Sequence, residues 1–217
     1  SKTAVIIDIN GVAVSTLNLT ISKNNYIGLA NSALAISKLN IDGSGILDIH
    51  NELPVNLESV DAANFSGGLS LSTRSPSSSI IGSSGVNSIK ILGGFQSLTL
   101  NNADDNVEII GGSAVINTAA GNDTILATGA SSLAISSGSG ADRIDVSSGS
   151  NSINSGADND NVKISRGTNT VSLGTGDDSL TIFDGNNTAF GGAGVDTISI
   201  FGGSNVIHSD TGEYIIT

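Results

Sequence analysis

One short motif repeats along the second half of the chain at an almost constant interval. In each copy, one polar residue separates an aspartate from the large aliphatic residue that follows it, as in Gly174-Thr-Gly-Asp-Asp178-Ser-Leu180. Successive aspartates are 18 residues apart, with a single step of 19. They are Asp105, Asp123, Asp142, Asp160, Asp178 and Asp196. Self-similarity at a fixed short period indicates a repeat architecture in which each coil packs against its neighbours.

The residues inside each repeat favour strands over helices. Eighteen residues equal about five turns of α-helix, so the period alone allows either. Internal glycine, serine and asparagine weaken helices and favour turns, and pieces such as Ile144-Asp-Val146 alternate like a strand with one buried face. The predicted inward column is Ile144, Val162, Leu180 and Ile198, and the predicted solvated column is Asp145, Lys163, Thr181 and Ser199.

Each unit also divides into two nine-residue halves. Asparagines mark the second half, namely Asn151, Asn169, Asn187 and Asn205. One coil is therefore predicted to be turn, strand, opposite turn and strand, with aspartates along one edge of the stack and asparagines along the other. Because stacked amides can hydrogen-bond along the axis, we expect the asparagine edge to be structural. The extra residue within 130–139 is not explained by this pattern.

The frame Gly-Gly-x-Gly-x-Asp-x-U-x, with U a large apolar residue, is complete at Gly191-Gly-Ala-Gly-Val-Asp196-Thr-Ile198. It resembles the calcium-binding nonapeptide repeat of RTX proteins. Some copies depart from it, since Asp158, Asn102 and Ala103 stand where the frame has glycine. The resemblance covers about residues 83–217. It implies an all-β fold, an elongated right-handed parallel β-solenoid (β-roll) with about 18 residues per coil.

The resemblance implies several Ca²⁺ ions along the aspartate edge, about five for the five intervals between six aspartates. Calcium takes about six to eight oxygen ligands, and coils about 4.8 Å apart would let neighbouring aspartates share an ion. Glycines would allow backbone carbonyls to turn towards it. The alternative is that the aspartates only form Asx-turns. The predicted metal residues are Asp105, Asp123, Asp142, Asp160, Asp178, Asp196, Asp158, Gly121, Gly138, Gly140, Gly156, Gly174, Gly176, Gly192 and Gly194.

Composition agrees with a thin core and with bound cations. The 217 residues include no cysteine, methionine or tryptophan, and 3% are aromatic. A formal net charge of −12 argues against a nucleic-acid partner, because neutralising phosphates requires clustered Lys and Arg. No apolar run has the length of a membrane span and no signal peptide opens the chain, so we expect no membrane insertion. The abrupt ends suggest a fragment of a longer protein.

Residues 1–80 lack the glycine-aspartate frame, although short strands are predicted, for example at 4–7 and 69–71. The stretch 57–71 is similar to rungs in the β-solenoid bodies of bacterial surface-layer (S-layer) proteins. We expect residues 1–80 to continue the solenoid without metal, with a separate β-domain as the alternative. Residues 81–217 are expected to form the RTX-like roll. The serine-rich segment 73–84, which contains Pro76, is the predicted junction.

No residue is predicted to be catalytic or to bind an organic cofactor. The two histidines, His50 and His208, do not form a metalloprotease spacing, and no serine lies in a Gly-x-Ser-x-Gly elbow beside a plausible base. The adjacent pairs Asp104-Asp105 and Asp177-Asp178 belong to the repeat turns, which argues against a sugar-cleaving pair. We expect the chain not to be an enzyme.

Three functions fit this pattern. The first is a structural, self-assembling module of a secreted S-layer protein that is folded and stabilised by calcium. The alternatives are the spacer region of an RTX adhesin and the carboxy-terminal roll of a secreted enzyme. The resemblance implies type I secretion and a place at the bacterial cell surface. The expected partners are copies of the protein and, through parts outside this chain, cell-surface polysaccharide or lipopolysaccharide.

Overall fold

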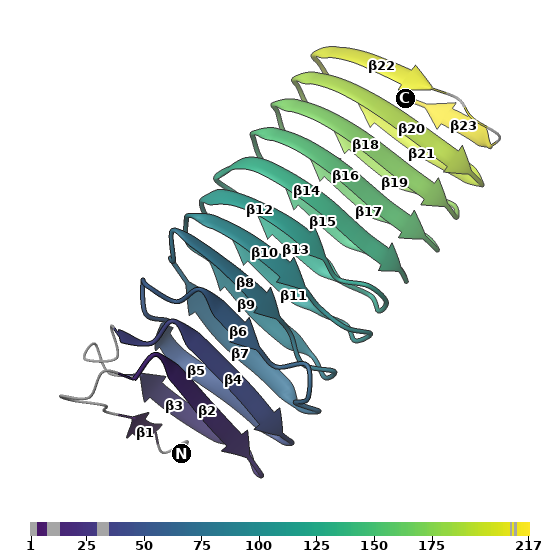
Figure 1. Ribbon diagram of the computed structural model, residues 1–217. Helices are drawn as coiled ribbons and strands as arrows, with labels where there is room; N and C mark the ends of the chain where they lie inside the picture. Colours follow the sequence, from purple (N-terminus) through teal and green to yellow (C-terminus); the bar gives the residue numbers. More distant parts are fainter. Residues whose placement is uncertain (1–3, 8–13, 30–34, 209, 211) are drawn as a thin grey trace.

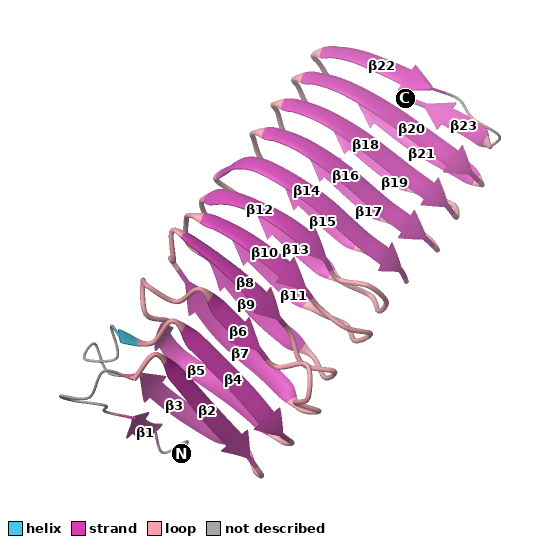
Figure 2. Ribbon diagram, in the orientation of Figure 1, coloured by secondary structure: helices cyan, strands magenta, loops and turns pink. Residues whose placement is uncertain are grey.

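The chain folds as a parallel β-solenoid in a computed structural model that describes residues 4–7, 14–29, 35–208, 210 and 212–217. Each coil contributes one strand to each of two facing sheets, and the coils stack along one axis from the amino to the carboxyl end (Figure 1). Figure 2 shows strands and turns along almost the whole described chain. The predicted fold class, an all-β parallel solenoid, is confirmed.

Within the described residues, sheet A has twelve strands and sheet B has eleven, and neighbouring strands in each sheet run parallel. Sheet A contains β1 (Ala4–Ile7), β3 (Asn25–Leu29), β5 (Ile46–Glu52), β7 (Gly68–Thr73), β9 (Asn87–Ile91), β11 (Asn106–Ile109), β13 (Thr124–Ala127), β15 (Arg143–Val146), β17 (Asn161–Ile164), β19 (Ser179–Ile182), β21 (Val195–Ile200) and β23 (Glu213–Ile216). Sheet B contains β2 (Thr16–Ile21), β4 (Lys38–Gly43), β6 (Ser59–Asp61), β8 (Ser77–Ile81), β10 (Phe95–Thr99), β12 (Gly112–Asn117), β14 (Ala130–Ser139), β16 (Ser150–Ala157), β18 (Thr168–Thr175), β20 (Asn186–Ala193) and β22 (Ser204–His208).

Alternating side chains of the two sheets fill the core. Ile144 pairs in register with Val162, and the same column continues through Leu180 to Ile198, all fully buried. The predicted inward column is therefore confirmed. The predicted outward column is also in register, and in it Lys163 Nζ lies 3.7 Å from Asp145 Oδ2.

The length of a coil changes along the chain. Tyr26 pairs with Asp48, a step of 22 residues, whereas Leu69 pairs with Asn87, a step of 18. The irregular spacing of apolar pieces in residues 1–80 therefore reflects longer coils. Some of the extra residues lie within β5, where the pairing with β7 shifts register between Asp48 and Glu52. Both sheets continue through segment 73–84 without a break. Pro54 and Pro76 lie outside the strands, as predicted.

The extra residue in segment 130–139 forms a β-bulge. Gly112 pairs with Ala130, but Ser113 pairs with Ser132, so Ser131 has no partner in β12. A bulge accommodates one additional residue and restores the pairing beyond it. The inward and outward alternation therefore resumes at Ser132 and continues unchanged into the following coils.

Two glycine columns let successive coils approach closely at the aspartate edge. The first contains Gly138, Gly156, Gly174 and Gly192, which are in register and have φ between 97° and 112°. A Cβ on Gly174 would lie 2.0 Å from the carbonyl oxygen of Gly156, so both backbone conformation and contact require glycine. The second column contains Gly121, Gly140, Gly176 and Gly194. Ala119 (φ 72°) and Asp158 (φ 76°) each occupy one place in these columns.

We predict that Gly174→Ala destabilises the solenoid by roughly 2–3 kcal/mol, because a Cβ meets backbone and a positive φ is strained for alanine. The matched control is Ser172→Ala on the same strand, where the half-buried outward side chain should tolerate the change. Thermal unfolding followed by circular dichroism measures both. Equal midpoints for the two variants would contradict the steric role of the column.

Candidate metal column

The six repeat aspartates lie at the corner where the chain passes from sheet B into sheet A. Each side chain points inward, and at most 3% of each residue is exposed. The backbone N–H of each of the first five donates to Oδ1 of the aspartate in the next coil, as from Asp160 to Asp178 at 2.8 Å. The same bond links the other neighbouring pairs at 2.8–3.0 Å. The sequence prediction of one aspartate per coil along a single edge is thus reproduced in space.

The second oxygen of each carboxylate is buried and has no hydrogen-bond partner. This holds for Oδ2 of Asp105, Asp123, Asp142, Asp160, Asp178 and Asp196. A buried carboxylate oxygen without a donor or cation is costly in its ionised form. The column therefore calls for a proton or a cation at each Oδ2.

The pKa values of these carboxyl groups are raised in the absence of metal. Loss of solvation is the largest cause for every group, and neighbouring carboxylates add to it. Burial raises the pKa of Asp105 and Asp123 to about 6 and that of Asp160 to about 7. Hydrogen bonds from the backbone of the previous coil oppose the shift without cancelling it.

Buried hydroxyl groups lie beside three of the carboxylates. Thr118, Ser137 and Ser155 stand five residues before Asp123, Asp142 and Asp160, and their proximity lowers those pKa values in part. A hydroxyl has one hydrogen to donate. Here it goes to a carbonyl oxygen of the following coil, as from Ser155 Oγ to Leu173 O at 2.8 Å. Each neighbouring Oδ2 consequently remains without a donor.

Neutral residues close the column at both ends. Asn87 occupies the aspartate position one coil before Asp105, and its Nδ2 donates to the carbonyl oxygens of Ser83 and Gly85 in its own turn, at 3.1 and 2.9 Å. Tyr214 pairs with Asp196 at the other end. Asn87 thus shows that carbonyl oxygens of the turn face this position and can accept hydrogen bonds from a donor such as the amide N–H.

A second ladder runs along the exposed side of the same turns. Asp104 Oδ1 accepts the N–H of Asn122, and Asn122 Oδ1 accepts that of Ala141, both at 2.8 Å. Asn159 and Asp177 act in the same way further along. Asp158, a predicted metal residue, is exposed and accepts the N–H of Gly140 through Oδ2 at 3.1 Å. Its carboxylate therefore lies apart from the buried column.

The asparagine edge is the neutral counterpart of the aspartate edge. Asn151 Nδ2 donates to Asn169 Oδ1 at 2.7 Å, and the ladder continues through Asn187 to Asn205. Each amide also donates to a carbonyl three residues earlier, as from Asn187 to Asp184 O at 3.2 Å. The predicted structural ladder is confirmed. Amides supply the donors that carboxylates lack.

Some residues of the two columns are not part of a repeat motif and are not predicted from the sequence. Gln96 lies in the asparagine column, accepts a hydrogen bond from Ser78 and donates to Ser75 O. Ala114 and Leu133 then interrupt the polar column before Asn151. Counting back by 18 from Asp105 and from Ala114 would have found Asn87 and Gln96.

The residues fit a cation that takes part of its coordination from the backbone. Among the described residues, no three His, Cys, Asp or Glu side chains gather around one point. Two carboxylates from neighbouring coils are the most that the column offers to one ion. Turn carbonyls and water would supply the rest of the roughly six to eight oxygen ligands that calcium requires. The predicted glycines all have positive φ at these turns, which fits such a role for their backbone.

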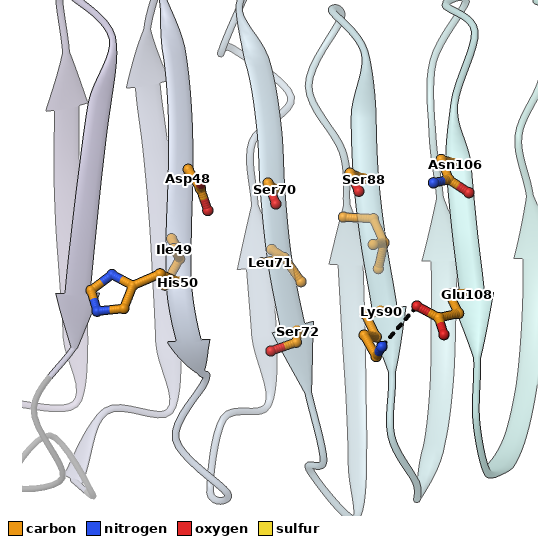
Figure 3. Close-up of a pocket in the computed structure, with 11 residues that line it drawn as sticks. Asp48, Ile49, His50, Ser70, Leu71, Ser72, Ser88, Lys90, Asn106 and Glu108 are labelled. Atoms are coloured by element: carbon orange, nitrogen blue, oxygen red, sulfur yellow. Dashed lines mark ion pairs between the residues drawn. The ribbon is translucent and has the colours of Figure 1, made fainter. Parts of the chain in front are cut away.

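The histidines lie outside the column. His50 stacks on Tyr26 with ring centroids 4.4 Å apart, and in Figure 3 its imidazole points away from Ser72. A shallow polar groove crosses the outer face of sheet A beside it, and the 2.8 Å ion pair between Lys90 and Glu108 lies at its far end (Figure 3). His208 is exposed on sheet B and stacks on Phe190.

No family model, curated protein or solved structure gives a significant match to this chain. Within the part of the chain that the structure describes, no helix is long and apolar enough to cross a membrane. The aspartate column itself therefore carries the functional argument.

The raised pKa values predict a metal-free fold that weakens as pH rises. Carboxyl groups whose pKa is about 6 to 7 in the fold, against an ordinary value of 3.8, contribute stability that is complete below pH 3.8 and lost as pH passes through 6 to 7. With chelator present, we expect a lower melting temperature at pH 8 than at pH 5. Asp160→Asn should reduce this difference. An identical pH dependence in that variant would contradict the prediction.

The amide ladder predicts a loss of stability without a loss of metal. Asn169→Ala removes one of the two acceptors of Asn151 Nδ2, which keeps its bond to Ser148 O, and removes the amide that donates to Asn187 Oδ1, so we expect a cost of about 1–3 kcal/mol. The number of bound ions, counted by calorimetry, should stay the same. A reduced ion count would show that the asparagine edge also takes part in metal binding.

Proposed function

We propose that this chain is a structural, self-assembling module of a secreted bacterial S-layer protein, folded and stabilised by Ca²⁺ along the aspartate edge. The six buried Oδ2 atoms without a partner carry the proposal. A column of ionised carboxylates about 4.8 Å apart repels itself. Cations between the coils turn the same column into a set of cross-links.

Calcium suits the column better than a transition metal. All the available ligand atoms at this edge are oxygens, from carboxylates, backbone carbonyls and water, and hard cations prefer such ligands. The hydrogen bonds of Asn87 support a cation with oxygen ligands. Its side-chain amide donates to two turn carbonyls, at the position where a cation would bind in the other coils. Because the core is thin and contains few aromatic residues, bound ions would contribute a large share of the folding free energy.

The solenoid favours a structural over a catalytic role. Coils upstream of the repeats belong to the same two sheets as the aspartate coils, which suits a surface-layer body or an adhesin spacer. A carboxy-terminal roll of a secreted enzyme would instead follow a globular domain. We therefore propose a non-enzymatic module, exported by a type I machine and located at the cell surface.

The substitution Asp178→Asn, which removes the charge and keeps the shape of the side chain, distinguishes a metal-binding role for Asp178 from a role only in the turn. The amide keeps an Oδ1 acceptor for the N–H of Asp160 and removes a buried charge. With chelator at pH 8, we expect the variant to melt at a higher temperature than the wild type. In saturating calcium we expect the opposite order, with fewer ions bound. Circular dichroism across a calcium titration and calorimetric ion counting test both.

Position in the column provides the matched control. Asp178 has aspartate neighbours in both directions, whereas Asp105 has Asn87 on one side. Asp178→Asn should therefore raise the calcium midpoint more than Asp105→Asn. A wild-type fold and melting temperature that do not respond to chelator would exclude the calcium role. Electron microscopy of the full-length protein with and without calcium tests the surface-layer setting, because only that setting predicts two-dimensional sheets.

A further inference from the structure

The outer face of sheet B carries no Asp, Glu, Lys or Arg side chain over eight consecutive strands. Its outward residues on β8, β10, β12, β14, β16, β18, β20 and β22 form three columns in register, which we call the sheet B face. The columns are Ser77, Phe95, Ser113, Ser132, Ser150, Thr168, Asn186 and Ser204; Ser79, Ser97, Val115, Ala134, Ser152, Thr170, Thr188 and Val206; and Ile81, Thr99, Asn117, Ser136, Asn154, Ser172, Phe190 and His208.

The other face of the solenoid is different. The outward residues of sheet A between β9 and β21 include Lys90, Glu108, Arg143, Asp145 and Lys163. Ion pairs link Lys90 to Glu108 and Asp145 to Lys163 across neighbouring strands, and Arg143 to Asp145 within β15. Solvated sheets commonly carry such charges, which discourage association between sheets. The sheet B face lacks this protection, although the chain as a whole has a net charge of −12.

The sheet B face is also flat in its middle. The outward side chains of the four central strands, β12, β14, β16 and β18, are no larger than valine or asparagine. Apolar side chains are exposed on it, with Phe95 at 49%, Val115 at 46% and Val206 at 54% exposure. A shallow hollow beside Phe95 is lined by Val115, Ala134 and Ser152.

We propose that the sheet B face is a self-association surface, through which two copies of this chain pack face to face. Charge is the first reason, because two molecules with a net charge of −12 repel one another least where neither carries charge. Periodicity is the second. Columns of small side chains repeating at about 4.8 Å match another face with the same spacing, and a second copy provides that spacing.

The area is the third reason. Seven intervals of about 4.8 Å and strands of five residues at about 3.3 Å give a face of roughly 550 Å². Two such faces would bury about 1,100 Å² in total, which is below the standard range that starts at about 1,200 Å² but above the roughly 1,000 Å² expected of a biological interface. A weak contact of this size suits a lattice in which each molecule has several neighbours. The inference rests on the proposed function for its setting in a surface lattice, but association in solution is tested separately.

The experiment is sedimentation equilibrium of the folded, calcium-saturated chain from micromolar to millimolar concentration. We expect a reversible dimer that strengthens with added salt, because salt screens the repulsion between two acidic molecules. Ser152→Lys places a charge at the centre of the face, and we expect it to weaken association by about tenfold or more. The matched control is Thr181→Lys on the outer face of sheet A, which adds the same charge and should not weaken the dimer.

The lysine pair also separates this surface from a general charge effect. Both variants reduce the net negative charge, so association limited by overall repulsion alone would become stronger in both. Circular dichroism verifies that each variant is folded. A wild-type chain that stays monomeric throughout, or equal weakening by both lysines, would overturn the proposal. Retention of a cell-surface glycan by the monomer, abolished by Ser152→Lys, would assign the face to that occupant instead and would also overturn it.

The two proposals can fail independently. A chain that folds without calcium but dimerises through the sheet B face would remove the calcium role and leave the self-association surface in place. A chain that requires calcium to fold but remains monomeric would do the reverse. Both outcomes are visible in the same samples, because folding is followed by circular dichroism and association by sedimentation.

Discussion

The structure depends on one geometric constraint, which is that each residue of a coil lies about 4.8 Å from its equivalent in the next coil. Any property of the repeat is thereby stacked on itself. Aliphatic residues gain from this, as the fully buried column from Ile144 to Ile198 shows. Amides gain as well, since each can donate to the next. Carboxylates do not, because ionised groups at that separation repel and have no hydrogen to share.

The two edges link neighbouring coils with different chemistry. On the aspartate edge each carboxylate accepts a backbone N–H from the coil before it, as Asp178 does from Asp160. On the asparagine edge Asn169, Asn187 and Asn205 accept the side-chain amide of the asparagine before them, and only Asn151 accepts a backbone N–H, from Leu133. The amide then uses its remaining donor on a neighbour, whereas the carboxylate has a free Oδ2. The asparagine edge is therefore complete by itself, and the aspartate edge becomes complete only with a proton or a cation. This difference makes one edge permanent and the other conditional.

Most of the fold could be predicted from the sequence because equivalent residues of successive coils have equivalent surroundings. The position of Asp160 in its coil determines the position of every other aspartate, and alternation alone places Val162 inside and Lys163 outside. The residues that were missed break the motif. Asn87 and Gln96 occupy repeat positions but are not part of a repeat motif, and the longer coils of residues 1–80 add residues at places that follow no period. The buried, unpartnered Oδ2 atoms could not be predicted from the sequence either, because they depend on hydroxyls such as that of Ser155 donating to a backbone carbonyl instead.

The bulge at Ser131 bears on a difficulty shared by all near-identical repeats. Coils of equal length and similar sequence can pair one coil out of step, and such a slip exchanges each inward residue for another of the same kind, with little penalty. Ser131 interrupts that equivalence, because β14 matches β12 only where the extra residue has room. Leu133 and Ala114, which break the polar column beside it, act in the same direction. A single inserted serine thus fixes the pairing register of β12 and β14, and the register of the remaining coils follows from it.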